Sequence, residues 1–280
     1  MSVWQAIVLG FVQGATEFAP VSSSGHLILV PWLFGWQHLG DSVDLAKTFD
    51  VALHMGTLLG AAIYFRRDLA RYIGAWVHSV VTRSISTTDE RIAWALAVGT
   101  IPGALVGAVS EDVIQERLGA PTLIAVMLAL FGVALYLVDK HMPSVRTIDS
   151  IGVRTGLFLG VAQALALQPG VSRSGVTMTA ARSIGLDRES AARFSFLLSL
   201  PIIAGAGLFK GADLMQTGFQ GFEAQFFWGF MSSAISGFLV IWGLLAYLKR
   251  HDFKVFMLYR LAVAALVLGL VAAGVRDATA

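Results

Sequence analysis

Long apolar runs alternate with short polar or charged stretches along the whole chain. A run of about 20 apolar residues is long enough to cross the hydrocarbon core of a bilayer as a helix. We therefore predict an all-α, polytopic membrane protein. Its full transmembrane helices, about six in number, are expected at about 48–65, 92–110, 118–138, 193–210, 224–248 and 255–275.

Two further apolar stretches, 1–40 and 155–181, are interrupted by residues that break helices. The breaks fall at Gly14, Pro20, Gly25 and Pro31 in the first stretch, and at Pro169 and Gly170 in the second. Each stretch is predicted to form a re-entrant helix–loop–helix segment with a polar turn. Such irregular backbone is tolerated at membrane depth only where protein or a water-filled cavity covers it.

The two broken stretches carry partial copies of one motif, offset by 150 positions. The matching residues are Leu9, Gly10, Gln13, Val21, Ser22, Ser24 and Gly25 in the first copy, and Leu159, Gly160, Gln163, Val171, Ser172, Ser174 and Gly175 in the second. The copies differ where their chemistry could differ. Ser23 corresponds to Arg173, and Glu17 corresponds to Leu167.

The charges of the loops predict the orientation of the chain. Basic loops at 66–91, 139–154, 182–193 and 249–254 are expected on the cytoplasmic side, and the more acidic loops 111–117 and 211–223 outside. The two broken segments then enter from opposite faces. We therefore predict one membrane domain, 1–280, built as an inverted repeat of halves about 1–110 and 118–275. Such repeats place a site near the midplane.

Within the basic loop 66–91, the apolar residues from Leu69 to Val80 have helical spacing, so this part is predicted to lie in the interface plane. Composition supports the membrane assignment. The chain is 56% hydrophobic and 14% charged, whereas soluble domains carry about 25% charged residues. Its net charge of +2 is too small to argue for nucleic acid as a partner. It has no cysteine, which excludes thiol catalysis and disulfides.

The second copy contains PGVSRSG, from Pro169 to Gly175. A turn rich in glycine and serine that leads into a helix exposes backbone N–H groups and is suited to binding anions. Ser172, Ser174 and Gly175 are therefore candidate phosphate-binding residues. Arg173 adds a planar cation suited to bidentate phosphate contact. The alternative is a small-residue helix contact with the arginine facing a cytoplasmic cavity.

The first copy forms the same turn without the arginine, with Ser22, Ser23, Ser24, Gly25 and His26. A hydroxyl there could attack phosphorus, with His26 or Glu17 as the base. Gln13 and Glu17 lie four residues apart and offer oxygen ligands for Mg²⁺ or Ca²⁺ that bridges phosphates. The alternative is a serine cluster bonded to helix carbonyls beside a buried structural histidine.

Three other ionisable residues lie inside apolar runs. Asp50 and His54 share one helix face. They could bind a metal or line the cavity, or they could shield each other from lipid. Arg260 has no acidic neighbour in sequence and is expected to snorkel to the cytoplasmic surface rather than face the cavity.

Five motifs resemble those of a known family. They are QGATEFAPVSSSGH (Gln13–His26), AKTFDVALHMGT (Ala46–Thr57), LQPGVSRSGVT (Leu167–Thr177), FSFLLSLP (Phe194–Pro201) and YR (Tyr259–Arg260). Over essentially its whole length the sequence resembles the undecaprenyl pyrophosphate phosphatases, the bacitracin-resistance family. By this resemblance the acidic motif is Gln13 and Glu17. The serine–histidine turn is Ser22, Ser23 and His26, and the arginine motif is Ser172, Arg173, Ser174 and Thr177.

The resemblance implies an enzyme of the bacterial inner membrane with its active site open to the outer face. It implies removal of one phosphate from a C55 polyprenyl pyrophosphate, which regenerates the carrier for cell-wall glycan synthesis and gives bacitracin resistance. It also implies a divalent cation, Mg²⁺ or Ca²⁺, and an inverted repeat with two re-entrant segments. Membrane lipids surround such a protein. The oligomeric state is left open, a homodimer included.

A transporter or polyprenyl-phosphate flippase is the competing function, because inverted repeats with broken helices are also a transporter design. The asymmetry of the copies favours a hydrolase, since only the first copy offers Glu17, Ser23 and His26 together. In the expected mechanism Ser23 attacks the terminal phosphorus with His26 as base and later acid. Direct attack by His26 or by water remains an alternative.

Overall fold

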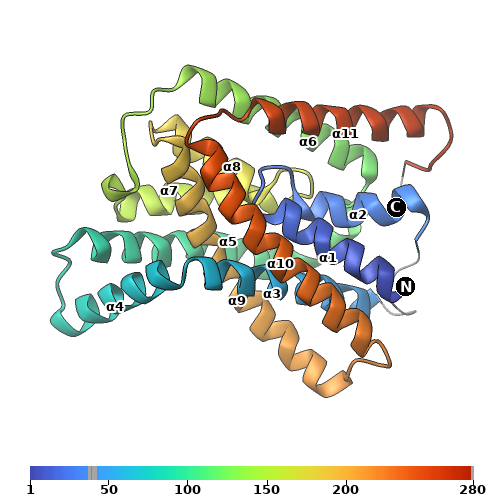
Figure 1. The fold of residues 1–280 in the computed structure, drawn as a ribbon, viewed down its shortest axis with the longest axis horizontal. Coiled ribbons are helices and arrows are strands. Elements are labelled where there is room, and N and C mark those ends of the chain that lie inside the picture. The colour runs from blue at the N-terminus through green and yellow to red at the C-terminus, as the bar shows by residue number, and fades with distance from the viewer. Residues whose placement is uncertain (37–38, 40–42, 279–280) are drawn as a thin grey trace.

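The computed structural model describes residues 1–36, 39 and 43–278, with the side chains at 43–44, 110–117, 213 and 215–217 left aside. The regular elements in this part of the chain are helices (Figure 1). The α-helices are α1 (Val3–Glu17), α2 (Ser23–Phe34), α3 (Val43–Tyr64), α4 (Arg66–Thr82), α5 (Thr88–Arg117), α6 (Pro121–His141), α7 (Val153–Ala164), α8 (Arg173–Ser183), α9 (Arg188–Thr217), α10 (Glu223–Leu248) and α11 (Lys254–Ala272). Two short 3₁₀ helices are η1 (Ile148–Ser150) and η2 (Leu165–Leu167).

The prediction of a multi-pass helical protein is confirmed at the level of its helices. Five are long and apolar enough to cross a membrane among the described residues: Thr88–Val109, Pro121–His141, Arg188–Ala212, Glu223–Leu248 and Lys254–Ala272. Helices α3 and α4 pass the same test only when they are taken together as one broken span, and they bend by 84° at the break. The run predicted at 48–65 lies in α3, and the amphipathic stretch predicted after it forms α4.

Both of the expected outer loops differ from the prediction. The acidic stretch 111–117, expected as an outer loop, continues α5 as far as Arg117. The other expected outer loop, 211–223, begins inside α9, which runs to Thr217. Neither 111–117 nor 211–217 contains a proline or a cluster of turn residues that would end a helix at the membrane boundary. The glycines of the second stretch that end α9 come later, at Gly218 and Gly221. Helices therefore extend beyond the apolar runs that identified them.

Both broken stretches form two helices joined by a turn, α1 with α2 and α7 with α8. Of the predicted breaks, Pro20, Pro169 and Gly170 lie in these turns, whereas the prediction was wrong for Gly14, which lies inside α1, and for Gly25 and Pro31, which lie inside α2.

The first helices of the two stretches pack through glycines at equivalent positions. Gly10 lies against the backbone of Gly229 in α10, and Gly160 lies against the backbone of Gly99 in α5. A β-carbon at either glycine would collide with that backbone, so these close helix pairs require glycine. Small residues are the usual means of close packing between membrane helices.

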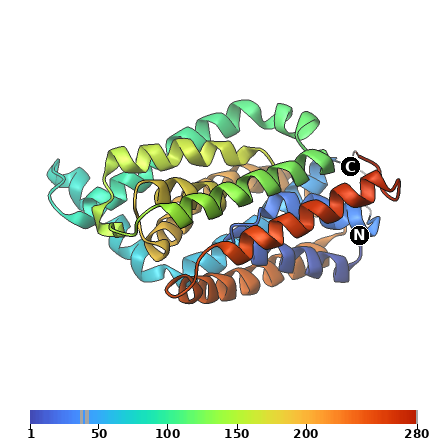
Figure 2. The ribbon, with the colours of Figure 1, turned by 90° about the horizontal axis from the view of Figure 1, so that it is seen from above.

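The turns that join these helices meet in the interior of the bundle. Residues 18–22 of the first turn and 169–172 of the second are all buried. The antiparallel pair α6 and α11 packs along this region, and the two helices run side by side in both views of the fold (Figures 1 and 2). The arrangement brings the two copies of the motif together at the centre of the protein.

Candidate active site

The two turns have the same unusual backbone. Ser22 and Ser172 precede α2 and α8, and both have a left-handed φ, 75° and 73°. Each serine Oγ accepts a hydrogen bond from the backbone N–H three residues on, at Gly25 (3.3 Å) and Gly175 (3.1 Å). Positive φ is uncommon for residues other than glycine, and such strained positions cluster at functional sites. Helices α2 and α8 thus begin with the same backbone conformation and the same serine cap.

Hydrogen bonds join the two turns to each other. The backbone N–H of Gly170 donates to Ser22 Oγ at 3.0 Å, and Ser174 Oγ donates to the carbonyl of Ala19 at 3.0 Å. Within each turn the paired serine hydroxyls also approach, at 3.4 Å for Ser22 and Ser24 and 3.1 Å for Ser172 and Ser174. Ser22 and Ser174 therefore hold the turns together, whatever else they contact.

Arg260 contacts both turns and is completely buried, so the prediction that it snorkels to the surface is wrong. Its guanidinium donates to the carbonyls of Pro20 (3.1 Å) and Gly170 (2.8 Å), one in each turn. It also donates to the carbonyls of Val171, Leu128 and Met127. Breaking a helix leaves carbonyls without partners, and the five N–H groups of an arginine can satisfy several at once.

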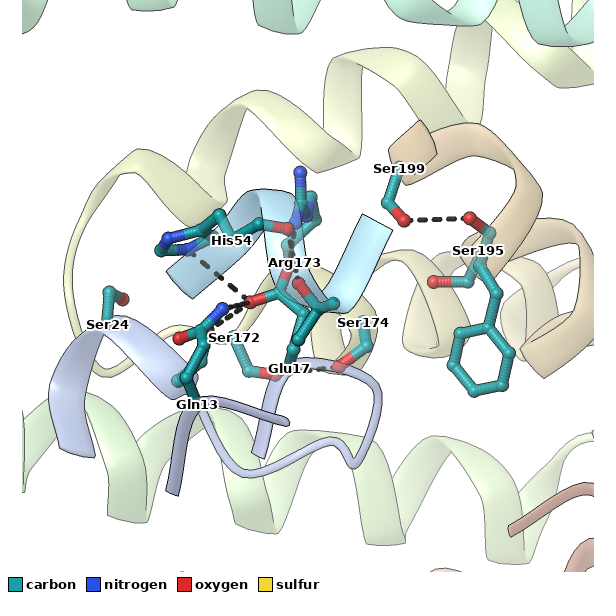
Figure 3. Close-up of polar contacts among 12 residues, drawn as sticks. Gln13, Glu17, Ser24, His54, Ser172, Arg173, Ser174, Ser195 and Ser199 are labelled. Carbon is teal, nitrogen blue, oxygen red and sulfur yellow. Dashed lines mark hydrogen bonds and ion pairs between the residues drawn. The ribbon is translucent and has the colours of Figure 1, made fainter. Parts of the chain in front are cut away.

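Glu17 is the centre of the polar contacts, at the end of α1 (Figure 3). One carboxylate oxygen accepts from the Arg173 guanidinium. The other accepts from Ser23 Oγ at 2.5 Å and from Gln13 Nε2 at 2.9 Å. His54 Nε2, on α3, lies 3.5 Å from that second oxygen. The structure thus joins Glu17 and Ser23 of the first copy with Arg173 of the second, as the sequence predicted.

These groups line a cavity of about 240 Å³. Its walls combine the polar turns with aliphatic side chains, and the lining residues are Glu17, Ser22, Ser23, Ser24, Val51, His54, Gly103, Gln163, Ala166, Leu167, Ser172, Arg173, Ile202, Ile203 and Ala206. Apolar walls lower the local dielectric, which strengthens the attraction between a bound anion and Arg173. The cavity is therefore suited to hold a phosphate group against two helix N-termini and one cation.

His26 does not line this cavity. Its Nδ1 lies 2.7 Å from the carbonyl oxygen of Ser22, and its Nε2 lies 2.8 Å from the hydroxyl of Tyr259, whose ring stacks on the imidazole. A carbonyl only accepts, so Nδ1 carries the proton and Nε2 accepts from the tyrosine. Both nitrogens are engaged away from Ser23. The group bonded to the Ser23 hydroxyl is Glu17, where the sequence had favoured His26 as the base.

Comparison with known proteins identifies the family. The family model described as bacitracin resistance protein BacA matches residues 6–266. This chain belongs to the BacA family. The BacA match contains every motif that carried the sequence resemblance, from the first turn to Tyr259 and Arg260.

Relatives named undecaprenyl-diphosphatase match this BacA-family chain along its length. The protein from Pelotomaculum thermopropionicum is 46% identical over 273 residues, 98% of each chain. The protein from Desulforudis audaxviator is 46% identical over 260 residues, 93% of this chain and 94% of the relative. The protein from Thermomicrobium roseum is 43% identical over 277 residues, 96% of this chain and 98% of the relative.

Among the candidate metal ligands, Asp50 is apart from the site that this BacA chain builds around Glu17. It lines a different cavity, with Arg276 and Asp277, and its side chain is exposed. Its backbone carbonyl accepts a hydrogen bond from His54 Nδ1 at 2.8 Å. The described residues contain no cluster of three His, Asp or Glu side chains that could hold a metal. Gln13 Oε1, beside Glu17, is a buried oxygen without a hydrogen-bond partner in the described structure.

The remaining predicted residues support the α8 turn of this BacA chain. Thr177 Oγ1 donates to the carbonyl of Arg173 at 2.6 Å and bonds Ser195 on α9, so it anchors the first turn of α8. Gly175 leaves room for the Arg260 guanidinium, whose Nη1 would lie 3.1 Å from a β-carbon there. Gly25 is packed against Ile124 of α6. We therefore see positioning roles for these three residues.

A second cavity, of about 490 Å³, adjoins the first and shares Val51 with it. Its lining is mostly aliphatic and aromatic, and includes Ala52, Met55, Leu214, Phe219, Phe226, Phe227 and Phe230. Helices α3 and α9 contribute to both cavities. The cavity that contains Glu17 and Arg173, which can hold an anion, therefore lies beside an apolar cavity that can hold hydrocarbon.

Proposed function

We propose that this chain is a membrane phosphohydrolase that converts undecaprenyl pyrophosphate to undecaprenyl phosphate. The observation that carries the proposal is the Ser23 hydroxyl, bonded to a carboxylate at 2.5 Å in a cavity that also contains Arg173 and two helix N-termini. The names of the relatives and the adjoining apolar cavity support a polyprenyl substrate. The product returns the lipid carrier to cell-wall synthesis, and removing the pyrophosphate form gives bacitracin resistance.

In the proposed mechanism Ser23 Oγ attacks the terminal phosphorus while Glu17 takes the hydroxyl proton. The bond from that phosphorus to the bridging oxygen breaks, and undecaprenyl phosphate leaves. Water then hydrolyses the phosphoserine and releases inorganic phosphate. A nucleophile within hydrogen-bond reach of a base, itself oriented by other groups, is the usual arrangement for such covalent catalysis. Here Arg173 and Gln13 orient Glu17.

His54 serves as the second proton carrier in this proposal. Its Nδ1 faces the backbone carbonyl of Asp50, so in the neutral ring Nε2 is the acceptor. That nitrogen lies 3.5 Å from the Glu17 oxygen that bonds Ser23. A proton taken by Glu17 can therefore pass to His54, which leaves Glu17 ionised to activate the hydrolytic water. Sequence spacing had placed His54 only in a pair with Asp50.

A divalent cation, Mg²⁺ or Ca²⁺, fits the same place as part of the proposal. Mg²⁺ commonly takes only one or two carboxylates from the protein and the rest of its oxygens from phosphates and water. Glu17 and the unpartnered Oε1 of Gln13 would be the protein ligands. Such an ion would neutralise phosphate charge. Arg173 and the N–H groups of both turns act on the same charge, and electrostatic stabilisation of this kind is usually a large part of catalysis.

The proposal has a direct test in detergent, where transport across a membrane is impossible. The purified protein should release phosphate from undecaprenyl pyrophosphate. Brief reaction with substrate labelled in the terminal phosphate should trap an acid-stable adduct that Ser23→Ala lacks and Ser24→Ala retains. An acid-labile adduct lost in His26→Ala would instead identify the histidine as nucleophile. Absence of phosphate release would favour the transporter or flippase.

We also propose that the chain is a single membrane domain, 1–280, of inverted-repeat topology in the bacterial inner membrane, with re-entrant turns and a site open to the outer face. The matched φ angles of Ser22 and Ser172 and the matched glycine packing of α1 and α7 support two equivalent halves. The basic loops support the orientation.

Single cysteines test this topology cleanly, because the chain has none of its own. Gln220→Cys, in the turn between α9 and α10, should react with an impermeant thiol reagent added to intact cells from which the outer barrier has been removed. Ser144→Cys, between α6 and η1, should react only after the membrane is opened. Reaction of both from the same side would contradict the proposed orientation.

A further inference from the structure

Gln163 is a buried side chain whose polar atoms have no partner. It lies near the end of α7, is 3% exposed, and lines the same cavity as Glu17 and Arg173. Neither Nε2 nor Oε1 makes a hydrogen bond within the described part of the protein. Buried amides in native proteins are nearly always hydrogen-bonded, so a side chain with both atoms unpaired needs an explanation.

The first copy of the repeat shows which partner this amide lacks. Gln13 is the equivalent residue in the first copy, and its Nε2 donates to Glu17 at 2.9 Å. Four residues after Gln163 the second copy has Leu167 in place of that glutamate. An amide with no partner in the protein costs folding free energy where an apolar side chain would not. The glutamine is therefore poorly explained as a packing residue.

The fold leaves space around the same amide. Gly103 of α5 faces it, and a β-carbon at that position would lie 3.3 Å from Gln163 Nε2 and 3.7 Å from its Cγ. A larger side chain at position 103 would therefore press against the Gln163 amide, and glycine leaves that amide accessible. Gln163 thus presents a free donor and a free acceptor to a cavity whose cation and helix N-termini attract anions.

We propose that Gln163 binds a phosphate group of the substrate, with Nε2 donating to a phosphate oxygen and Oε1 accepting from a protonated phosphate oxygen or a bound water. This rests on the proposed function, and it adds a contact from the second copy that neither the motifs nor the charges indicated. A neutral amide suits this position because it supplies a donor without bringing a second anion toward Glu17. The head group is then held by Arg173 and Gln163 together.

Gln163→Met tests the assignment, because methionine keeps the length of the side chain and removes both polar atoms. The probe is inorganic pyrophosphate as a competitive inhibitor, with undecaprenyl pyrophosphate as substrate. We expect the inhibition constant and KM to rise roughly tenfold, the scale of a lost hydrogen bond to a charged group. The melting temperature without ligand should stay the same or rise, since no protein hydrogen bond is lost.

Gln168→Met is the matched control. Its Nε2 bonds the carbonyls of Pro169 (2.9 Å) and Leu118 (3.2 Å), so this variant should lower the melting temperature. The inference is overturned if Gln163→Met binds pyrophosphate as the wild type does, or if it loses as much thermal stability as Gln168→Met. A wild-type protein that neither binds pyrophosphate nor releases phosphate would instead contradict the proposed function itself.

Discussion

Replacing Glu17 with glutamine is expected to lower kcat by at least about 10²-fold, the scale for a positioned acid–base or electrostatic group. The amide preserves the shape of the side chain but cannot take the Ser23 proton. It also offers only one acceptor to the donors that now share two carboxylate oxygens, Arg173, Ser23 and Gln13. The measurement is phosphate release at saturating substrate and saturating divalent cation.

Glu90→Gln provides the control for this loss. Glu90 is also a buried carboxylate, 1% exposed, and it accepts hydrogen bonds from the backbone N–H groups of Ser86 and Thr87. Glu90 does not line the cavity that contains Glu17 and Arg173. The control should therefore lower thermal stability with little effect on kcat, whereas Glu17→Gln should lower kcat far more than any loss of stability explains. Near wild-type turnover of Glu17→Gln would remove Glu17 from the proposed mechanism.

Replacing Arg173 with lysine is expected to lower kcat by roughly 10²-fold or more, about 3 kcal/mol, the cost of removing one preorganised donor. Lysine keeps the charge and can still pair with Glu17, but it loses the planar fork that contacts two oxygens at once. If the fork holds the phosphoryl group as charge builds in the transition state, kcat and kcat/KM should fall together while KM changes little.

Two comparisons sharpen this test. Ser174→Ala, in the same turn, should cost less than Arg173→Lys, because the N–H groups of the turn remain in place. Arg182→Lys changes another buried arginine, which bonds Asp139 at 2.7 Å outside the catalytic cavity, so it should affect stability rather than turnover. A kcat for Arg173→Lys within about threefold of the wild type would show that the arginine only attracts the anionic head group.

Sequence patterns predicted the helices, the two broken stretches and the meeting of Glu17 with Arg173, which are 156 positions apart. These features follow from the length of the apolar runs, from the positions of proline and glycine, and from an internal repeat. All three are visible in the amino-acid sequence. The lengths of α5 and α9 were underestimated, because their ends are polar and lie beyond the apolar runs. An apolar run predicts which part of a helix crosses the hydrocarbon core, but it does not predict the residue at which the helix ends.

The histidines show why the site itself was harder to predict. His26 lies three positions from Ser23, which favoured it as the base, but α11 brings Tyr259 against its ring and the Ser22 carbonyl takes its other nitrogen. His54 is distant in sequence and reaches Glu17 only because α3 packs beside α1. Proximity along a chain and proximity across a helix bundle are different quantities, and only the second decides proton transfer.

The place of Arg260 in the chain also bears on how the protein is made. Its guanidinium bonds carbonyls of both turns, yet it belongs to α11, the last helix in the described part of the chain. Ribosomes deliver the N-terminal segments first. A nascent chain thus carries both turns in the membrane before the cation that joins them has been synthesised. The carbonyls of Pro20 and Gly170 therefore receive their shared donor only after α11 has been inserted.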